Sequence, residues 1–364
     1  MRIILKTLVG PTPPRARLLS AALALALAAP SISAGAADSA WGPAQARGVV
    51  RERAQLIMGT IARVTAESAA SGDAAIDGAF AAMRAVDEEM SLYRPSSGLV
   101  RLNAHAARHP EPVAPDLCRV VTEGRRVSEE TSGAFDITVL PLLRAWGAYR
   151  DLRHLGGYNP RSVGFAGLEV DPARCTVAFR REGMGIDLGG IAKGFALDRA
   201  REALVLAGAS RAVVDLGGNL AFLGSGPDGA WRVAVRDPAA PDRPLGVLVL
   251  GAGATVATSG NYERDFRAEG WRARSHIYDP RTGAPVLVPR AVTVWGPSAT
   301  VGDALSTALL VLGSDGAAEV LEREPDVGAL FVEGRRILLH GRAPLQWIPD
   351  AAAPTSRDEL RESS

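Results

Sequence analysis

The 364-residue chain has almost no lysine. Lys6 and Lys193 are its only lysines, and arginine supplies the rest of the 41 basic side chains. Aromatic residues are also few, at 5%, and the formal net charge is +1. A nucleic-acid-binding surface usually shows a basic stripe and stacking aromatics, so this composition argues against nucleic acid as a partner.

Cysteine is equally scarce, with only Cys118 and Cys175. The sequence contains no Cys-x-x-Cys or His-Glu-x-x-His pattern, which argues against a dedicated zinc site. It also has no Walker A motif and no Gly-x-Ser-x-Gly motif. The two cysteines can pair in an oxidising compartment or stay apart as buried thiols, and their spacing leaves both possibilities open.

The first 36 residues have the pattern of an export signal. Basic residues precede an apolar run from Leu18 to Ala29, and the small residues Ala34-Gly35-Ala36 follow it. The run is too short to cross a bilayer as a helix, so we predict a signal peptide over 1–36 that is cleaved on export. No cysteine lies near the junction, so we expect a soluble periplasmic protein without a lipid anchor. The choice between Sec and twin-arginine export stays open.

Roughly 320 residues remain, enough for one large domain or two moderate ones. We predict one domain over 48–341, with two subdomains as the alternative, and a loosely held tail over 342–364. Hydrophobic periodicity predicts a strand over 56–66 and a hairpin turning at Glu333-Gly334. The other predicted helices are 74–90, 114–130, 301–312 and 317–324, and the other predicted strands are 211–215, 219–224, 231–235, 245–250 and 290–295. Strands and helices are interspersed without strict alternation, which indicates an α+β fold with mixed or antiparallel sheets packed with helices.

Residues 224–229 match the G-x-G-x-x-G pattern of dinucleotide-binding turns. In a dinucleotide-binding turn, this pattern is followed directly by a helix. Here the residues that follow, from Trp231 to Arg236, alternate as a strand does. We therefore interpret the segment as a hairpin turn.

Lys193 lies in the segment from Ile186 to Gly194, which contains Asp187 and a glycine turn. Across such a turn, the aspartate and the lysine can face one ligand, and the glycines let backbone groups approach it. The alternative is a surface lysine on the first turn of a helix. Asp-Leu-Gly-Gly occurs again at 215–218, so two glycine turns can bring two loops against a common ligand.

Asp303 and Thr307 are four residues apart in an apolar stretch, so on a helix their oxygens share one face. A hard cation such as Mg²⁺ suits a carboxylate, a hydroxyl, a backbone carbonyl and phosphate oxygens. The alternative makes Asp303 an N-terminal helix cap and Thr307 a core residue bonded to its own helix.

His276 precedes a tight turn that begins at Asp279-Pro280. A histidine beside a turn-fixed aspartate suits a general base, although a hydrogen-bonded structural histidine is the alternative. We assign no role to the other four histidines.

Together these segments resemble the ApbE family of FAD:protein FMN transferases. The resemblance runs from Met58 to about Leu312 and rests on several motifs in order. These motifs are Met58-Gly59-Thr60, Tyr93-Arg94-Pro95, Ser132 to Val139, Asp187 to Gly194, Asp215 to Asn219, Ala257 to Gly260, Ser275 to Gly283, and Asp303 to Thr307.

Members of this family bind FAD and Mg²⁺, transfer FMN to a threonine or serine of a target protein, and release AMP. The resemblance implies Mg²⁺ ligation by the Gly190 carbonyl, Asp303 and Thr307, and charge neutralisation by Lys193. His276 or Asp279 would accept the proton of the incoming hydroxyl, and His276 is favoured because its ordinary pKa lies near neutrality. The implied FAD contacts are Met58, Tyr93, Ala134, Phe135, Asp136, Asp187, Lys193 and Tyr278.

Two rival functions use the same motifs. With water in place of the acceptor hydroxyl, the protein would be an FAD pyrophosphatase that yields FMN and AMP. If it bound FAD without catalysing a reaction, it would be a periplasmic FAD carrier. The resemblance implies acceptors among membrane electron-transfer subunits, such as those of sodium-pumping quinone reductases (Nqr-like), Rnf-like complexes or NosR-like nitrous oxide reductase maturation systems. The chain lacks the lipobox cysteine that many relatives carry.

Overall fold

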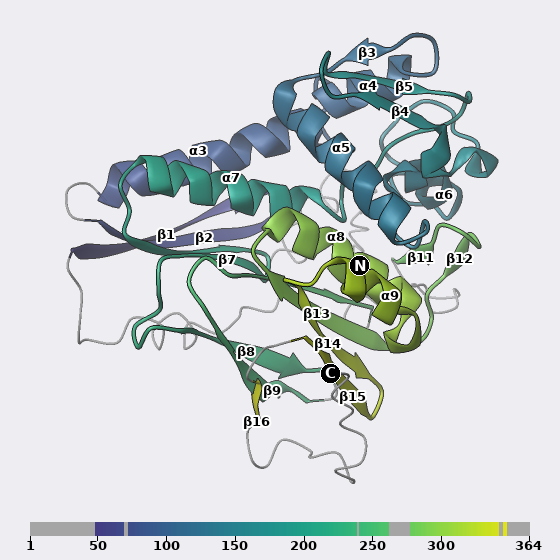
Figure 1. The fold of residues 1–364 in the computed structure, drawn as a ribbon. Helices are drawn as coiled ribbons and strands as arrows, with labels where there is room; N and C mark the ends of the chain where they lie inside the picture. Colours follow the sequence, from purple (N-terminus) through teal and green to yellow (C-terminus); the bar gives the residue numbers. More distant parts are fainter. Residues whose placement is uncertain (1–47, 69–71, 239, 262–276, 342–344, 348–364) are drawn as a thin grey trace, which may run out of the picture.

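The computed structural model describes residues 48–68, 72–238, 240–261, 277–341 and 345–347. The predicted signal peptide and His276 lie outside the described residues. The predicted α+β fold is confirmed, because an eight-stranded antiparallel sheet carries helices on one face (Figure 1). In spatial order its strands are β1 (Val49–Ile57), β2 (Thr60–Ser68), β6 (Arg211–Leu216), β7 (Asn219–Leu223), β10 (Thr255–Gly260), β13 (Arg290–Gly296), β14 (Gly328–Glu333) and β15 (Arg336–His340).

Three helices cover one face of this sheet: α3 (Gly72–Met90), α7 (Ala192–Leu206) and α8 (Ala299–Leu312). The other face packs against a small sheet of β8 (Trp231–Asp237), β9 (Ala240–Leu250) and β16 (Leu345–Trp347). Strand alternation explains the two cores. In β14, Phe331 belongs to the helix-side cluster, whereas Leu330 and Val332 belong to the cluster beneath the small sheet. The central strands are therefore apolar on both faces.

A lobe with its own small sheet lies beyond α5 (Pro115–Glu130) at the upper right of Figure 1. It contains α4 (Gly98–His105), α6 (Leu140–Ala145), β3 (Glu111–Pro112), β4 (Leu168–Asp171) and β5 (Thr176–Phe179), with the short 3₁₀ helices η1 (Ile137–Val139), η2 (Pro160–Ser162) and η3 (Phe165–Gly167). The hairpin of β11 (Tyr278–Asp279) and β12 (Ala284–Pro285), the 3₁₀ helix η4 (Ser314–Gly316) and α9 (Ala318–Arg323) complete the described elements. Within the described ranges, no helix combines the length and apolar character needed to cross a bilayer.

Three expectations from the sequence need correction. The single strand predicted over 56–66 is a hairpin, because Met58 and Gly59 adopt φ angles of 52° and 71° and reverse the chain between β1 and β2. Residues 224–229 form a turn, but not a hairpin, since β7 and β8 belong to different sheets. In the predicted loose tail, Leu345 to Trp347 pair with β9, so this part of the tail is ordered by backbone hydrogen bonds.

Candidate active site

Asp303 lies in the second turn of α8, where it is only 3% exposed. Ser298, not Asp303, caps the helix by accepting a hydrogen bond from the Val301 N–H. The helix-cap alternative for Asp303 is therefore wrong. A buried carboxylate needs donors from elsewhere in the chain, and the structure supplies three groups for it.

Two of those groups follow the two Asp-Leu-Gly-Gly turns. The Gly194 N–H donates to Asp303 Oδ2 at 3.0 Å, and the Asn219 side-chain amide donates to Asp303 Oδ1 at 2.8 Å. Lys193 is the third group, with Nζ 3.9 Å from Oδ1. Segments that follow both turns therefore meet at the carboxylate of Asp303. The prediction that the two turns face a common ligand stays a prediction.

Gly194 is required at its position by close packing between α7 and α8. A Cβ at Gly194 would lie 2.1 Å from the carbonyl oxygen of Ala299 and 2.8 Å from Cβ of Asp303. Any larger residue would push the helices apart. Lys193 is the second residue of α7 and its side chain is 32% exposed, so its ammonium group reaches solvent as well as Asp303.

Hydroxyl groups surround the other predicted metal ligands. Thr307 Oγ1 lies 3.4 Å from the Asp303 carbonyl oxygen and 3.3 Å from Ser259 Oγ. Ser259 in turn lies 2.7 Å from Ser306 Oγ. A Cβ on Gly190 would lie 3.4 Å from Thr307 Oγ1 and 3.0 Å from the ring of Phe135. The backbone of Gly190 is therefore beside Thr307. Metal ligation by the two residues stays a prediction.

The Asp187 carboxylate is held by two donors. The Gly189 N–H donates to Oδ1 at 2.7 Å, and the hydroxyl of Tyr149 donates to Oδ2 at 2.6 Å. Burial raises the pKa of Asp187, and these two hydrogen bonds oppose that rise. The ring of Tyr149 packs edge-on against Tyr93, with centroids 5.6 Å apart. Tyr93 is 69% exposed, so part of its ring faces solvent next to Tyr149.

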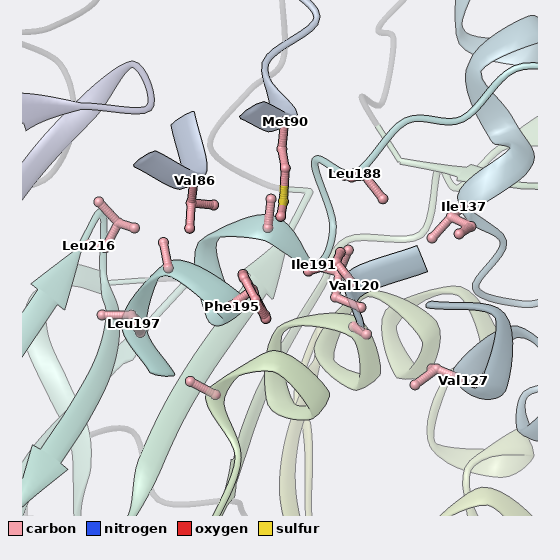
Figure 2. Packing of buried hydrophobic residues seen from close by; sticks show 14 of the residues in the cluster. Val86, Met90, Val120, Val127, Ile137, Leu188, Ile191, Phe195, Leu197 and Leu216 are labelled. Atoms are coloured by element: carbon pink, nitrogen blue, oxygen red, sulfur yellow. The ribbon is translucent and has the colours of Figure 1, made fainter. Parts of the chain in front are cut away.

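Beneath this segment, Leu188 and Ile191 of the loop and Phe195 of α7 belong to the main core (Figure 2). Asn103 of α4 fixes the backbone just before Asp187, because its amide accepts from the Ile186 N–H at 2.7 Å and donates to the Ile186 carbonyl at 2.9 Å. The core packing of these apolar residues and the hydrogen bonds of Asn103 thus hold the backbone on both sides of Asp187 in place.

The loop from Ser132 to Asp136 lies next to this group. Asp136 is buried, and its carboxylate accepts the N–H and hydroxyl of Thr138 and the N–H of Phe165. Burial raises the pKa of Asp136 against the effect of those donors. These bonds give the Asp136 side chain a role in shaping the loop. Its predicted contact with FAD stays a prediction, as do those of Ala134 and Phe135.

The β11–β12 hairpin carries the remaining predicted residues. The ring of Tyr278 packs on that of Trp146 with centroids 5.5 Å apart, and Trp146 Nε1 donates to the Gly283 carbonyl. Arg281 donates three hydrogen bonds to Asp279 at 2.9 Å each. Burial would raise the pKa of Asp279, but the bonds and charge of Arg281 outweigh it and lower that pKa.

The donor set around Asp303 is compatible with a hard cation. It consists of one carboxylate, the hydroxyl of Thr307 and the backbone beside it, which are oxygen ligands of the kind that Mg²⁺ takes. Among the described residues, no cluster of three or more His, Cys, Asp or Glu side chains forms a metal site. A cation at Asp303 would therefore need water or phosphate oxygens to complete its shell.

Two open surface hollows lie away from this group. One, of about 590 Å³, is lined by Arg201, Leu206 and neighbours, and the other, of about 540 Å³, by Cys118, Cys175 and neighbours. Neither includes a predicted site residue. The candidate site is therefore identified by its side-chain chemistry, not by a deep cavity.

Comparison with known proteins agrees with the motif pattern. Residues 58–331 match the model of the ApbE family. The chain belongs to the ApbE family. A relative from Treponema pallidum, 33% identical over 79% of this chain and 86% of its own length, is named FAD:protein FMN transferase. A relative from Escherichia coli K12 with the same name is 32% identical over 65% of this chain and 71% of its own length.

Solved ApbE structures confirm the predicted fold. The apo form of the flavinyl transferase ApbE from Pseudomonas stutzeri aligns with a TM-score of 0.66 and 30% identity, covering 78% of this chain and 91% of that one. The ApbE protein of Thermotoga maritima gives a TM-score of 0.68 at 29% identity, covering 82% and 97%.

Four residues of the site were missed as site residues in the sequence: Tyr149, Asn219, Ser259 and Ser306. Asn219 had a visible signal, because it directly follows the second Asp-Leu-Gly-Gly. Ser259 and Ser306 lie inside quoted ApbE motifs without having been assigned a role. Tyr149 had no signal, since it comes from a polar loop far in sequence from Asp187.

Proposed function

We propose that this chain is an FAD:protein FMN transferase that uses Mg²⁺ and releases AMP. The observation that carries the proposal is the convergence of two glycine turns and Lys193 on the buried carboxylate of Asp303. A cation and an ammonium group at one point suit the pyrophosphate of FAD. The names of the ApbE relatives support the same activity.

In the proposed reaction, the hydroxyl oxygen of an acceptor threonine or serine attacks the phosphorus atom of the FMN half of FAD. The bond from that phosphorus to the bridging oxygen breaks, and AMP leaves with the bridging oxygen. The acceptor hydroxyl loses its proton to a base, and a phosphoester joins FMN to the protein. A bound Mg²⁺ would neutralise negative charge on the pyrophosphate.

Different residues of the chain would bind the cation, neutralise charge, stack on the rings of FAD and accept the proton. Asp303, Thr307 and the Gly190 carbonyl would hold the cation, and Lys193 would neutralise charge on the leaving AMP. Tyr93 and Tyr278 each present a ring braced by another aromatic residue, which suits stacking on the flavin or adenine. We propose His276 as the base, because Arg281 already engages both carboxylate oxygens of Asp279.

We further propose that the protein works in the periplasm on a membrane-associated electron-transfer protein of the Nqr-, Rnf- or NosR-like kind. The support is the export signal over 1–36 and the family resemblance. The N-terminal residue of the protein recovered from a periplasmic extract, read by mass spectrometry, tests the export step. An N-terminus at residue 1 would contradict it.

Intact-mass spectrometry tests the activity itself. A candidate acceptor domain is incubated with the mature protein, FAD and Mg²⁺, with a chelator control and with the Asp303→Asn variant. A metal-dependent mass gain of one FMN phosphoester, absent with Asp303→Asn, is expected. AMP release without any acceptor gain would favour FAD hydrolysis. If neither product forms with any acceptor tried while FAD still binds, the proposal fails in favour of an FAD carrier.

A further inference from the structure

The two cysteines lie together although 56 residues separate them in the chain. Cys118 is in the first turns of α5, and Cys175 ends the turn between β4 and β5. The Val113 N–H donates to the Cys175 carbonyl at 2.9 Å, and β3 pairs with the start of β5. The chain that enters α5 therefore runs directly beside residue 175.

The side chains meet as well as the backbones. The Cys118 thiol lies close enough to the Cys175 thiol for the two to interact, and no disulfide joins them in the structure. Cys118 is 3% exposed, whereas Cys175 is half-buried. Both line the open hollow of about 540 Å³ at the N-terminal end of α5, so a small reagent can approach the pair from solvent.

The backbone at Cys175 carries a conformational cost. Its φ angle is 48°, in the left-handed region where glycine or asparagine is usual at the end of such a turn. Among the described residues, the other non-glycine positions with positive φ are Met58, Ser132 and Tyr149. All three lie in candidate active-site loops, where strain is common. Cys175 lies away from that site, so active-site strain does not account for its positive φ. A role for its thiol would explain why cysteine, and not glycine or asparagine, occupies this position.

We propose that Cys118 and Cys175 form an intramolecular disulfide when the protein meets an oxidising compartment. The oxidant is a disulfide compound, either a small-molecule disulfide or an exported thiol–disulfide oxidase. Cys175, the more accessible thiol, loses its proton and attacks that disulfide, releasing one reduced thiol and forming a mixed disulfide. Cys118 then displaces the second reduced thiol. Two protein thiols are oxidised and one external disulfide is reduced to two thiols.

The order of attack has a physical reason. Burial, followed by the contact with Cys175, raises the pKa of the Cys118 thiol to about 11. Its thiolate is scarce at neutral pH, and the thiolate is the nucleophile. Cys118 therefore acts second, within the mixed disulfide, where its neighbour's sulfur is already beside it.

The crosslink would brace the lobe that carries part of the candidate active site. It would close the loop between residues 118 and 175, which contains Phe135, Asp136 and Tyr149. Closing a loop of this length restricts the unfolded chain, so the oxidised protein is expected to melt about 5 °C above the reduced one.

The test uses the mature protein in reduced form and after incubation with glutathione disulfide. Each sample is denatured and treated with a maleimide, and its mass is then measured. Two labels are expected before oxidation and none after, with a loss of two hydrogens and no dimer on a non-reducing gel. Two labels after oxidation, a stable glutathione adduct, or a disulfide-linked dimer as the main product would each overturn the proposal.

Melting with and without reductant provides the second readout. Wild type is compared with Cys118→Ser and with Cys175→Gly, which also relieves the positive φ. Reductant is expected to lower the melting temperature of wild type and to leave both variants unchanged. If oxidised wild type melts no higher than reduced wild type, the bracing role is wrong even if the bond forms.

Discussion

Asn219 donates its side-chain amide to Oδ1 of Asp303 at 2.8 Å, and its own amide oxygen lies 3.3 Å from the Thr258 N–H. The turn after β6 and the strand β10 thus fix one oxygen of a buried carboxylate. The other oxygen is fixed by Gly194 at the start of α7. Asp303 is oriented by three separate segments before any ligand arrives, which is the kind of preorganisation that metal-assisted chemistry needs.

Replacement of Asn219 by alanine is therefore expected to lower the affinity for Mg²⁺ more than it lowers the stability of the fold. Loss of an outer partner of a metal ligand typically costs about 10- to 100-fold in metal affinity or activity. The measurement is the Mg²⁺ concentration that gives half-maximal FAD consumption. Asn159→Ala, which removes an amide that only caps η2, is the matched control. Equal Mg²⁺ requirements in the two variants would contradict the assigned role of Asn219.

Gly194→Ala is expected to damage both the fold and the site. The added methyl group would meet the Ala299 carbonyl oxygen at 2.1 Å, so α7 and α8 must separate, at a cost of about 1–3 kcal/mol. The shift would also break the hydrogen bond from Gly194 to Asp303.

Gly78→Ala in α3 is the control for this substitution, because a Cβ there meets nothing within 4 Å. It is expected to raise stability by about 0.5–1 kcal/mol through helix propensity. Urea unfolding of both variants measures the difference. A Gly194→Ala protein as stable as Gly78→Ala would show that the close helix contact is not required.

The residues that meet around Asp303 were visible in the sequence because they lie in short segments. Asp303 and Thr307 share one helix, and each Asp-Leu-Gly-Gly turn is contiguous, so spacing alone brought the main residues into view. Most of the longer helices and several strands followed from periodicity for the same local reason.

Long-range contacts set the limit of prediction. No local pattern shows that the Tyr149 hydroxyl reaches Asp187 across 38 residues. The hairpin at Met58-Gly59 was missed because a non-glycine residue at positive φ has no distinct sequence signal. The strand β16 was missed because its order depends on pairing with β9.

Because lysine is so scarce, Lys193 can be labelled selectively with an amine-specific reagent. After removal of residues 1–36, Lys193 carries the only side-chain amine, so an amine-acylating reagent can modify only this residue and the N-terminus. FAD with Mg²⁺ is expected to protect Lys193 and leave the N-terminus reactive, as read by peptide mass spectrometry. Equal labelling of Lys193 with and without FAD would show that its ammonium group does not face the ligand.

The charge of Lys193 can be tested by replacement. Lys193→Met is expected to lower the transfer rate by about 10²–10³-fold, as for the loss of one charge-stabilising donor. Its melting temperature should change little, because the side chain is 32% exposed. Lys193→Arg keeps the charge and is expected to retain more activity than Lys193→Met. Equal rates for the two variants would mean that the charge is not what matters.

Tyr149→Phe is expected to destabilise the protein in a pH-dependent way. Burial raises the pKa of Asp187, so its contribution to stability is full at acidic pH and declines as pH rises through the raised pKa. The Tyr149 hydroxyl limits that rise by stabilising the carboxylate. Without it the pKa of Asp187 rises further, and the variant loses about 1–3 kcal/mol relative to wild type at neutral pH.

The measurement is the difference in melting temperature between wild type and Tyr149→Phe at about pH 5 and about pH 7.5. The difference should be larger at the higher pH. Tyr158→Phe, which removes a hydroxyl that does not bond Asp187, should show no such trend. A pH-independent difference for Tyr149→Phe would mean that Asp187 is not the group that the hydroxyl stabilises.

The acid side of the pH–rate profile separates the two candidate bases. Arg281 lowers the pKa of Asp279, so Asp279 is already ionised well below neutrality and is a weak proton acceptor there. If His276 is the base, transfer should fall below about pH 6.5 as its imidazole gains a proton. His276→Gln should remove this limb and lower the plateau rate by about 10²–10⁴-fold, whereas Asp279→Asn should keep the limb in place. A limb that persists in His276→Gln and disappears in Asp279→Asn would assign the proton transfer to the carboxylate despite its pairing with Arg281.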